Sequence, residues 1–201
     1  MNMNERLASL GVRLISSTNS DATKNEMGAT TLVFVKVPPP PCAPEPAVQE
    51  LGVDASSLSR GLEEDVFEPY FALQPSESVN MSLIQQQAEE ARQCTTYMCP
   101  HVSPLTLQRA AEQGTLQHVV VAGIDQDVIV MYYDESAHFK QRPYNAKASQ
   151  WIKNIEKAGN KEQEEEAIYG DVFLVRRVNG QFVSLDICNL EAESWFTVEA
   201  K

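Results

Sequence analysis

The dipeptide Asn179-Gly180 constrains this chain more than any other feature. It separates two apolar segments, residues 171–178 and 181–187, that are rich in β-branched and aromatic side chains. A two-residue type I′ turn requires a positive φ at both central positions, and Asn-Gly meets that requirement at low cost. The sequence therefore predicts an antiparallel hairpin over residues 171–187.

A second strand pair precedes this hairpin. Residues 118–122 and 127–133 are apolar and β-branched, and the four residues between them suit a hairpin connection. Residues 145–158 have the periodicity of an amphipathic helix, with Trp151 and Ile152 on its apolar face. We therefore expect an α+β domain over residues 100–201, with the two hairpins in one small antiparallel sheet and the helix packed on a face.

The first half of the chain is less regular. Residues 31–37 are typical of a single strand, which ends at the prolines of residues 38–41. A run of prolines forms a stiff spacer or an exposed docking segment. We expect a flexible N-terminal segment over residues 1–30, and a strand, a proline spacer and a helical region over residues 31–99.

Charge and cysteine content limit the partners and the compartment. The net charge is -12, which argues against non-specific binding to nucleic acid or to anionic membranes, because both require a surplus of Lys and Arg. No apolar run is long enough to span a bilayer, and no secretory signal pattern opens the chain. The four cysteines are too scattered for a disulfide scaffold. These features predict a cytoplasmic protein in a reducing compartment.

Several short motifs of the second half occur in a fixed order. Leu107-Gln108 comes before the strand at residue 118, and Tyr133-Asp134-Glu135 ends the next strand; Pro143 to Ala148 (PYNAKA) and Tyr169-Gly170-Asp171-Val172 follow. Over residues 105–188 this order resembles a small family with a domain of unknown function from actinobacteria, their phages and some eukaryotic microbes. Arg142-Pro143 stands where that family usually has leucine before proline. The resemblance implies a fold and domain boundaries, but no reaction.

A basic segment interrupts the acidic chain. Residues 136–161 contain six basic residues and one acidic residue. At the predicted helix start, free backbone amides and the helix dipole favour an anion. We therefore predict an anion-binding or partner-binding site that consists of Lys140, Arg142, Tyr144, Asn145 and Lys147. The alternative is a solvated helix face whose charges pair with one another or with Glu162–Glu166.

The sequence evidence for a metal site or a catalytic site is weaker than that for the basic segment. Cys94, Cys99 and His101 form a C-x4-C-x-H cluster of zinc-type ligands, but structural zinc sites use closer cysteine pairs, so buried loop cysteines are favoured and no metal is predicted. The same cysteines, with the chain's three histidines and Asp134, contain the parts of a Cys-His-Asp nucleophile but lack a surrounding motif.

Carboxylates at the ends of one predicted strand are the last candidates. Mg²⁺ or Ca²⁺ is bound by such oxygens, and the residues concerned are Asp125, Asp127, Asp134 and Glu135. Turn formation by Asp125 and solvation of Glu135 at an edge are the favoured explanation, and no EF-hand pattern follows Asp125.

These observations favour a non-enzymatic accessory or binding protein that acts through contact with another protein and needs no cofactor. One alternative is a metal-dependent hydrolase or nucleotide-handling enzyme with its site near residues 134–147. A second alternative is an acidic mimic of nucleic acid.

Overall fold

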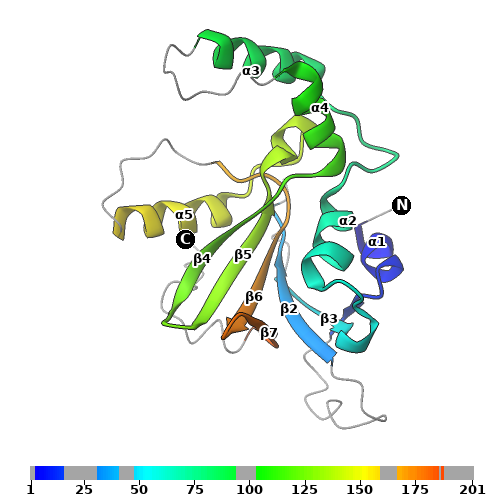
Figure 1. Cartoon of the computed structure of the whole chain (residues 1–201), viewed down its shortest axis with the longest axis vertical. Coiled ribbons are helices and arrows are strands. Elements are labelled where there is room, and N and C mark those ends of the chain that lie inside the picture. The colour runs from blue at the N-terminus through cyan, green and yellow to red at the C-terminus, as the bar shows by residue number, and fades with distance from the viewer. Residues whose placement is uncertain are drawn as a thin grey trace.

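The computed structural model describes residues 3–15, 31–40, 48–93, 103–158, 167–185 and 187. Within these residues the chain forms one antiparallel sheet of seven strands, with helical segments on both faces and a helix pair beyond one end (Figure 1). The predicted α+β class is confirmed.

The sheet joins segments that are far apart in the sequence. Its order is β1-β3-β2-β6-β5-β4, and β7 also pairs with β6. The strands are β1 (Arg13–Leu14), β2 (Thr31–Val37), β3 (Gln49–Asp54), β4 (Leu116–Ile124), β5 (Asp127–Asp134), β6 (Val172–Val178) and β7 (Gln181–Val183). The late strand β6 therefore lies in the middle, between β2 and β5.

The helices occupy three places around this sheet. One face carries α1 (Met3–Ser9), the π-helix η3 (Glu63–Phe67) and α2 (Glu68–Phe71), and the other face carries α5 (Ala146–Ala158). The helices α3 (Met81–Gln93) and α4 (Pro104–Gln113) pack on each other beyond the end of the sheet (Figure 1). Short 3-10 helices η2 (Ala55–Ser57) and η4 (Glu135–Lys140) complete the set.

Both predicted hairpins are present. Asn179 and Gly180 have φ angles of 52° and 79°, as a type I′ turn requires, and they connect β6 to β7. Strands β4 and β5 pair over residues 116–134, and Asp125 in their turn has a φ of 55°. The predicted helix at residues 145–158 corresponds to α5.

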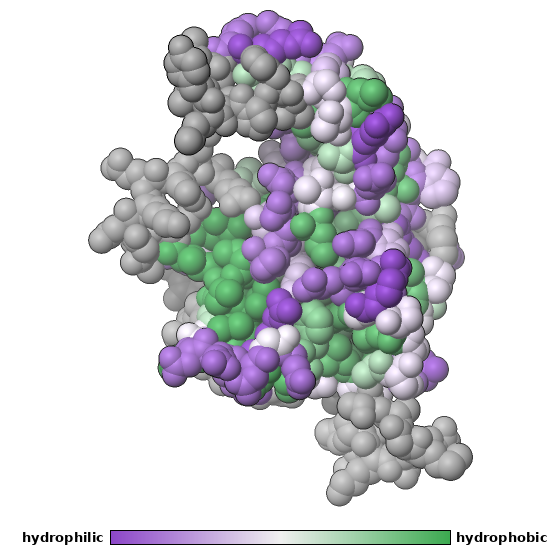
Figure 2. Space-filling model, viewed as in Figure 1, coloured by the Kyte–Doolittle hydropathy of each residue, from purple (hydrophilic) through white to green (hydrophobic). Residues whose placement is uncertain are grey.

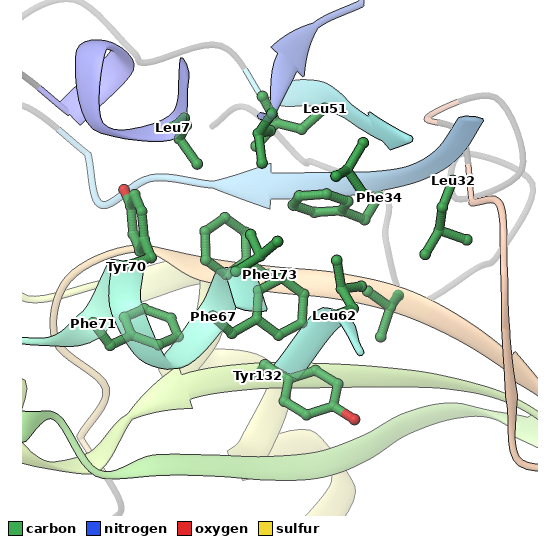
Figure 3. Close-up of a cluster of buried hydrophobic side chains, with 14 of the residues drawn as sticks. Leu7, Leu32, Phe34, Leu51, Leu62, Phe67, Tyr70, Phe71, Tyr132 and Phe173 are labelled. Carbon is green, nitrogen blue, oxygen red and sulfur yellow. The ribbon is translucent and has the colours of Figure 1, made fainter. Parts of the chain in front are cut away.

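An aromatic core fills the face under η3 and α2. Phe67 of η3 stacks on Phe173 of β6 with ring centroids 4.8 Å apart, and the edge of Phe34 contacts both rings at 5.5 Å (Figure 3). All three side chains are fully buried. Truncation of such a ring to alanine typically costs about 3–5 kcal/mol, so this cluster fixes the helical segment on the sheet.

A second core lies on the opposite face under α5. Side chains alternate along β5, so that Val130 and Tyr132 point into the aromatic core while Ile129 and Met131 point toward α5. Trp151 is among the α5 residues that cover this second core. The central strands are therefore buried on both faces, which explains their nearly continuous apolar sequences.

The described part of the first half contributes strands to the sheet. The strand expected at residues 31–37 pairs with β6, with Val35 opposite Leu174, so the sheet crosses the boundary expected near residue 100. Within the N-terminal segment expected to be flexible, residues 3–15 contain α1 and β1, and Leu7 and Val12 are buried in the aromatic core. The proline run begins at Pro38, directly after β2. Residues 16–30 and Pro41 lie outside the described residues.

Candidate functional site

Lys140, a predicted anion ligand, is buried in an ion pair. Its Nζ lies 2.6 Å from Asp134 Oδ2 and donates to the Phe71 carbonyl oxygen at 2.6 Å. Its side chain is 0% exposed. Burial lowers the pKa of Lys140, and the Asp134 carboxylate offsets part of that effect. The structure therefore places this cation inside the protein, already paired.

Arg142 lies beside the same carboxylate, Asp134, and also pairs with Glu77. Its guanidinium donates to both carboxylate oxygens of Glu77 at 3.2 Å, and its Nη1 lies 3.6 Å from Asp134 Oδ2. Although burial raises the pKa of Glu77, hydrogen bonds from Arg142 and from the Gln74 backbone N–H bring that pKa below its ordinary value. We call Glu77, Asp134, Lys140 and Arg142 the buried ion network.

The network caps the C-terminal end of α2. Lys140 and Arg142 both donate to the Phe71 carbonyl oxygen, and Arg6 donates to the carbonyl oxygens of Pro69 and Ala72. Carbonyl groups at a helix C-terminus have no partner within the helix and carry partial negative charge, so cations are favoured there. The basic side chains thus have a structural explanation in which no external anion takes part.

Asn145 also has an internal role. It is 0% exposed, and its Oδ1 accepts from the Ala148 backbone N–H as the N-cap of α5. Its Nδ2 donates to the carbonyl oxygens of Val37 and Gly170 at 3.2 and 2.9 Å. One amide side chain therefore connects α5 to the ends of β2 and β6.

The other two predicted site residues are nearer the surface. Tyr144 is 45% exposed, and its ring contacts Tyr169 edge-on at 5.8 Å. Lys147 is half-buried in the first turn of α5. The structure brings Lys140 and Arg142 together but leaves Tyr144 outside the network. The expected pairing with Glu162–Glu166 lies outside the described residues.

Of the candidate metal and catalytic residues, some lie outside the described residues and others are held in internal contacts. Cys94, Cys99 and His101 lie outside the described residues. Asp134 is fully engaged by Lys140, by the hydroxyl of Ser136 and by the Thr115 backbone N–H, while Asp127 forms a bidentate pair with Arg176. In the part of the chain that the structure describes, no group of three His, Cys, Asp or Glu side chains is arranged to hold a metal ion.

The outer edge of β4 is a site that the sequence analysis did not identify. Strand β4 lies at the end of the sheet, and within the described residues it pairs only with β5. It has nine residues, LQHVVVAGI, none of them charged. Val120 and Ile124 are 48% and 80% exposed. We call residues 116–124 with this unpaired side the β4 edge.

Edge strands of this kind are usually blocked by charge, proline or a bulge. Here the register shifts between Val120 and Ala122, so that Val121 is the extra residue of a bulge. Neither lysine nor proline occurs in the strand. Five residues on one side of the bulge and three on the other pair with β5, but Gly123 has a φ of 129° and departs from the extended conformation. An extended segment can therefore form regular backbone hydrogen bonds along the part of this edge before the bulge, residues 116–120.

The sheet face under η3 carries a polar cluster beside this edge. The His118 ring packs against Tyr132 with centroids 5.4 Å apart, and the Tyr132 hydroxyl donates to Glu63. Burial, followed by the interactions with Glu63, raises the pKa of Tyr132. Arg177 Nη1 lies 3.7 Å from Glu63 Oε1, and the Glu63 side chain is 37% exposed. Glu63 thus places a partly exposed carboxylate next to the β4 edge.

Comparison with protein-family models, with curated proteins and with solved structures gives no match. The family resemblance of residues 105–188 therefore stays a prediction. Among the helices that the structure describes, none has the length and apolar character needed to cross a membrane.

Proposed function

We propose that this protein is a binding module that takes an extended segment of another protein onto the β4 edge by strand addition. The observation that carries the proposal is an uncharged nine-residue strand whose outer side is unpaired within the described residues. Backbone hydrogen bonds supply affinity in such complexes, and the side chains on either face supply specificity. The aromatic core holds this strand through β5 and β6, so the edge is presented by a rigid support.

The buried ion network supports the same proposal indirectly. Its cations are almost fully buried and contact Asp134, Glu77 and the Phe71 carbonyl oxygen, so the network is hardly accessible to an external anion, although Arg142 Nη1 has no hydrogen-bond acceptor among the residues that the structure describes. Within the described residues, no strand has to be displaced from the outer side of β4. Binding there adds hydrogen bonds and buries Val120 and Ile124, the two most exposed apolar side chains of the strand.

The test is selection of twelve-residue unconstrained peptides on the full-length protein, followed by hydrogen–deuterium exchange of the complex. We expect selected peptides to slow amide exchange within residues 116–124. In an added strand, every second backbone N–H group faces β4. Methylation of the peptide nitrogens at one set of alternate residues should therefore abolish binding, while methylation at the other set should be tolerated.

A double variant, Val120→Lys with Ile124→Lys, is expected to lose the selected peptides. Leu14→Lys is the matched control, since Leu14 is an exposed apolar residue on β1 at the opposite end of the sheet. The proposal is wrong if the selected peptides bind the double variant and the wild type equally, or if no peptide protects residues 116–124.

A further inference from the structure

The two faces of the sheet beside β4 indicate which side chains a bound strand would need. An added strand projects its side chains alternately to the two faces of the sheet, in line with those of β4. One set meets the surface beside α5, and the other set meets the surface beside η3. The partner's sequence pattern is therefore determined by two different surroundings.

The face beside α5 is apolar. Val119 and Ala122 of β4 are only partly buried, and Ile155 of α5 is partly buried in the same core. Figure 2 shows apolar side chains at the surface where Figure 1 places β4 and β5 next to α5. Branched aliphatic side chains of an added strand would extend this core outward from Val119 and Ala122.

The face beside η3 is acidic. The first turn of η3 contains Glu63, Glu64 and Asp65, and the side chains of Glu63 and Glu64 are 37% and 50% exposed. Arg60 pairs with Glu64 and Asp65, and Arg177 lies beside Glu63, so three carboxylates face two guanidinium groups and one negative charge remains in excess. His118 of β4 packs on Tyr132, whose hydroxyl reaches Glu63, so these two rings offer a surface along which a long side chain can extend from the strand toward η3. Lysine and arginine have apolar stems and charged ends that suit such a path.

Both ends of β4 carry exposed carboxylates. Asp125 follows the strand in the turn, and Glu135 accepts a hydrogen bond from Gln117 at the start of the strand. The whole chain has a net charge of -12, so a second copy would bring the same charge to the interface. A basic segment of a different protein is attracted by the same field.

Resting on the proposed function, we infer that the β4 edge selects a basic amphipathic strand: branched apolar residues at alternate positions, with Lys or Arg between them and at the ends. The apolar residues pack beside α5. The basic residues face Glu63 and Glu64 and flank Asp125 and Glu135. The two copies of a dimer lack this charge complementarity.

The experiment uses three synthetic peptides of nine residues, the length of β4. One alternates lysine with valine, the second alternates glutamate with valine, and the third alternates threonine with valine. Binding to the full-length protein is measured by fluorescence anisotropy at low and high salt, and protection of residues 116–124 by hydrogen–deuterium exchange. We expect the lysine peptide to bind at least about tenfold more tightly than the glutamate peptide at low salt.

Two charge-matched variants locate the effect. The variant Glu63→Gln, Asp125→Asn, Glu135→Gln is expected to lose most of the preference for lysine. The control variant Glu68→Gln, Glu89→Gln, Glu90→Gln removes three exposed carboxylates elsewhere and is expected to keep the preference.

The outcomes separate the two claims. If the threonine peptide protects residues 116–124 as well as the lysine peptide does, strand addition stands and the basic partner is wrong. Equal loss of lysine preference in both variants also overturns the basic partner, because general attraction then accounts for it. Protection of residues 116–124 by none of the peptides contradicts the inference and the proposed function together.

Discussion

The buried ion network and the β4 edge differ in the relation between charge and exposure. In the network, Lys140 and Arg142 are almost fully buried, and each hydrogen-bonds to protein groups. The β4 edge has no charge, yet it exposes Val120, Ile124 and an unpaired row of backbone groups within the described residues. A cluster of charge in the sequence can therefore stabilise the interior, while an uncharged strand can be the surface that a partner contacts.

The largest expected effect comes from removal of the central carboxylate of the network. Asp134→Ala leaves Lys140 and Arg142 buried without their shared acid, and the Thr115 N–H loses its acceptor. Breaking a buried pair by removal of one partner typically costs about 3–5 kcal/mol. Urea unfolding monitored by Trp fluorescence measures the free energy of unfolding. A loss no larger than that of Asp127→Asn, which breaks an exposed pair with Arg176, would show that the network contributes little.

Asn145→Ala should have the next largest effect. The change removes the N-cap of α5 and leaves the carbonyl groups of Val37 and Gly170 without their side-chain donor. We expect a loss of roughly 2–4 kcal/mol, the sum of a cap and buried hydrogen bonds. Asn145→Ser retains a capping oxygen and should recover part of that loss. Equal unfolding free energies for the two variants would contradict the capping role.

Acidification tests the outer part of the network. The pKa of Glu77 in the folded protein is below its ordinary value of 4.5, so its stabilising contribution is complete above 4.5 and disappears as the pH falls through the lowered pKa. The difference in unfolding free energy between the wild type and Glu77→Gln should therefore be largest near neutral pH and should shrink below 4.5. A difference that is constant across this range would show that the Arg142–Glu77 pair does not depend on charge.

The smallest stability effect is expected at the β4 edge. Val120→Lys changes a side chain that is 48% exposed and breaks no described hydrogen bond, so the free energy of unfolding should change by no more than about 0.5 kcal/mol. Peptide binding at this edge should nevertheless be lost. A large destabilisation measured by urea unfolding would mean that the exposed strand contributes to the core, and the contrast with the network would fail.

Much of the fold could be predicted from the sequence because its signals are local. The Asn179-Gly180 turn, the two apolar hairpins and the helix at residues 145–158 depend on turn chemistry and side-chain periodicity within short windows. The membership of β2 and β3 in the same sheet could not be predicted in this way. It depends on pairing between Val35 and Leu174, which no local pattern encodes.

The basic residues near Asn145 show the corresponding limit for sites. Their clustering was visible in the sequence, but Glu77 and the α2 carbonyl groups that pair with them are more than 60 residues away. The β4 edge was missed for the opposite reason. Its sequence, LQHVVVAGI, is that of an ordinary hairpin strand, and its position at the end of the sheet is decided by the strand order.

The central position of β6 has a consequence for biosynthesis. Residues 172–178 of β6 leave the ribosome after the neighbouring strands β2 and β5 have been made. Until then, β2 and β5 each have an edge that lacks its β6 partner. Closing the sheet brings Val35 to Leu174 across most of the chain, and such long-range pairing is slow. A nascent chain that stops before residue 172 contains two separate hairpins and no joined sheet. The two hairpins therefore join only after residue 178 has been made, and until then the unpaired edge of β2 is a surface that chaperones can bind.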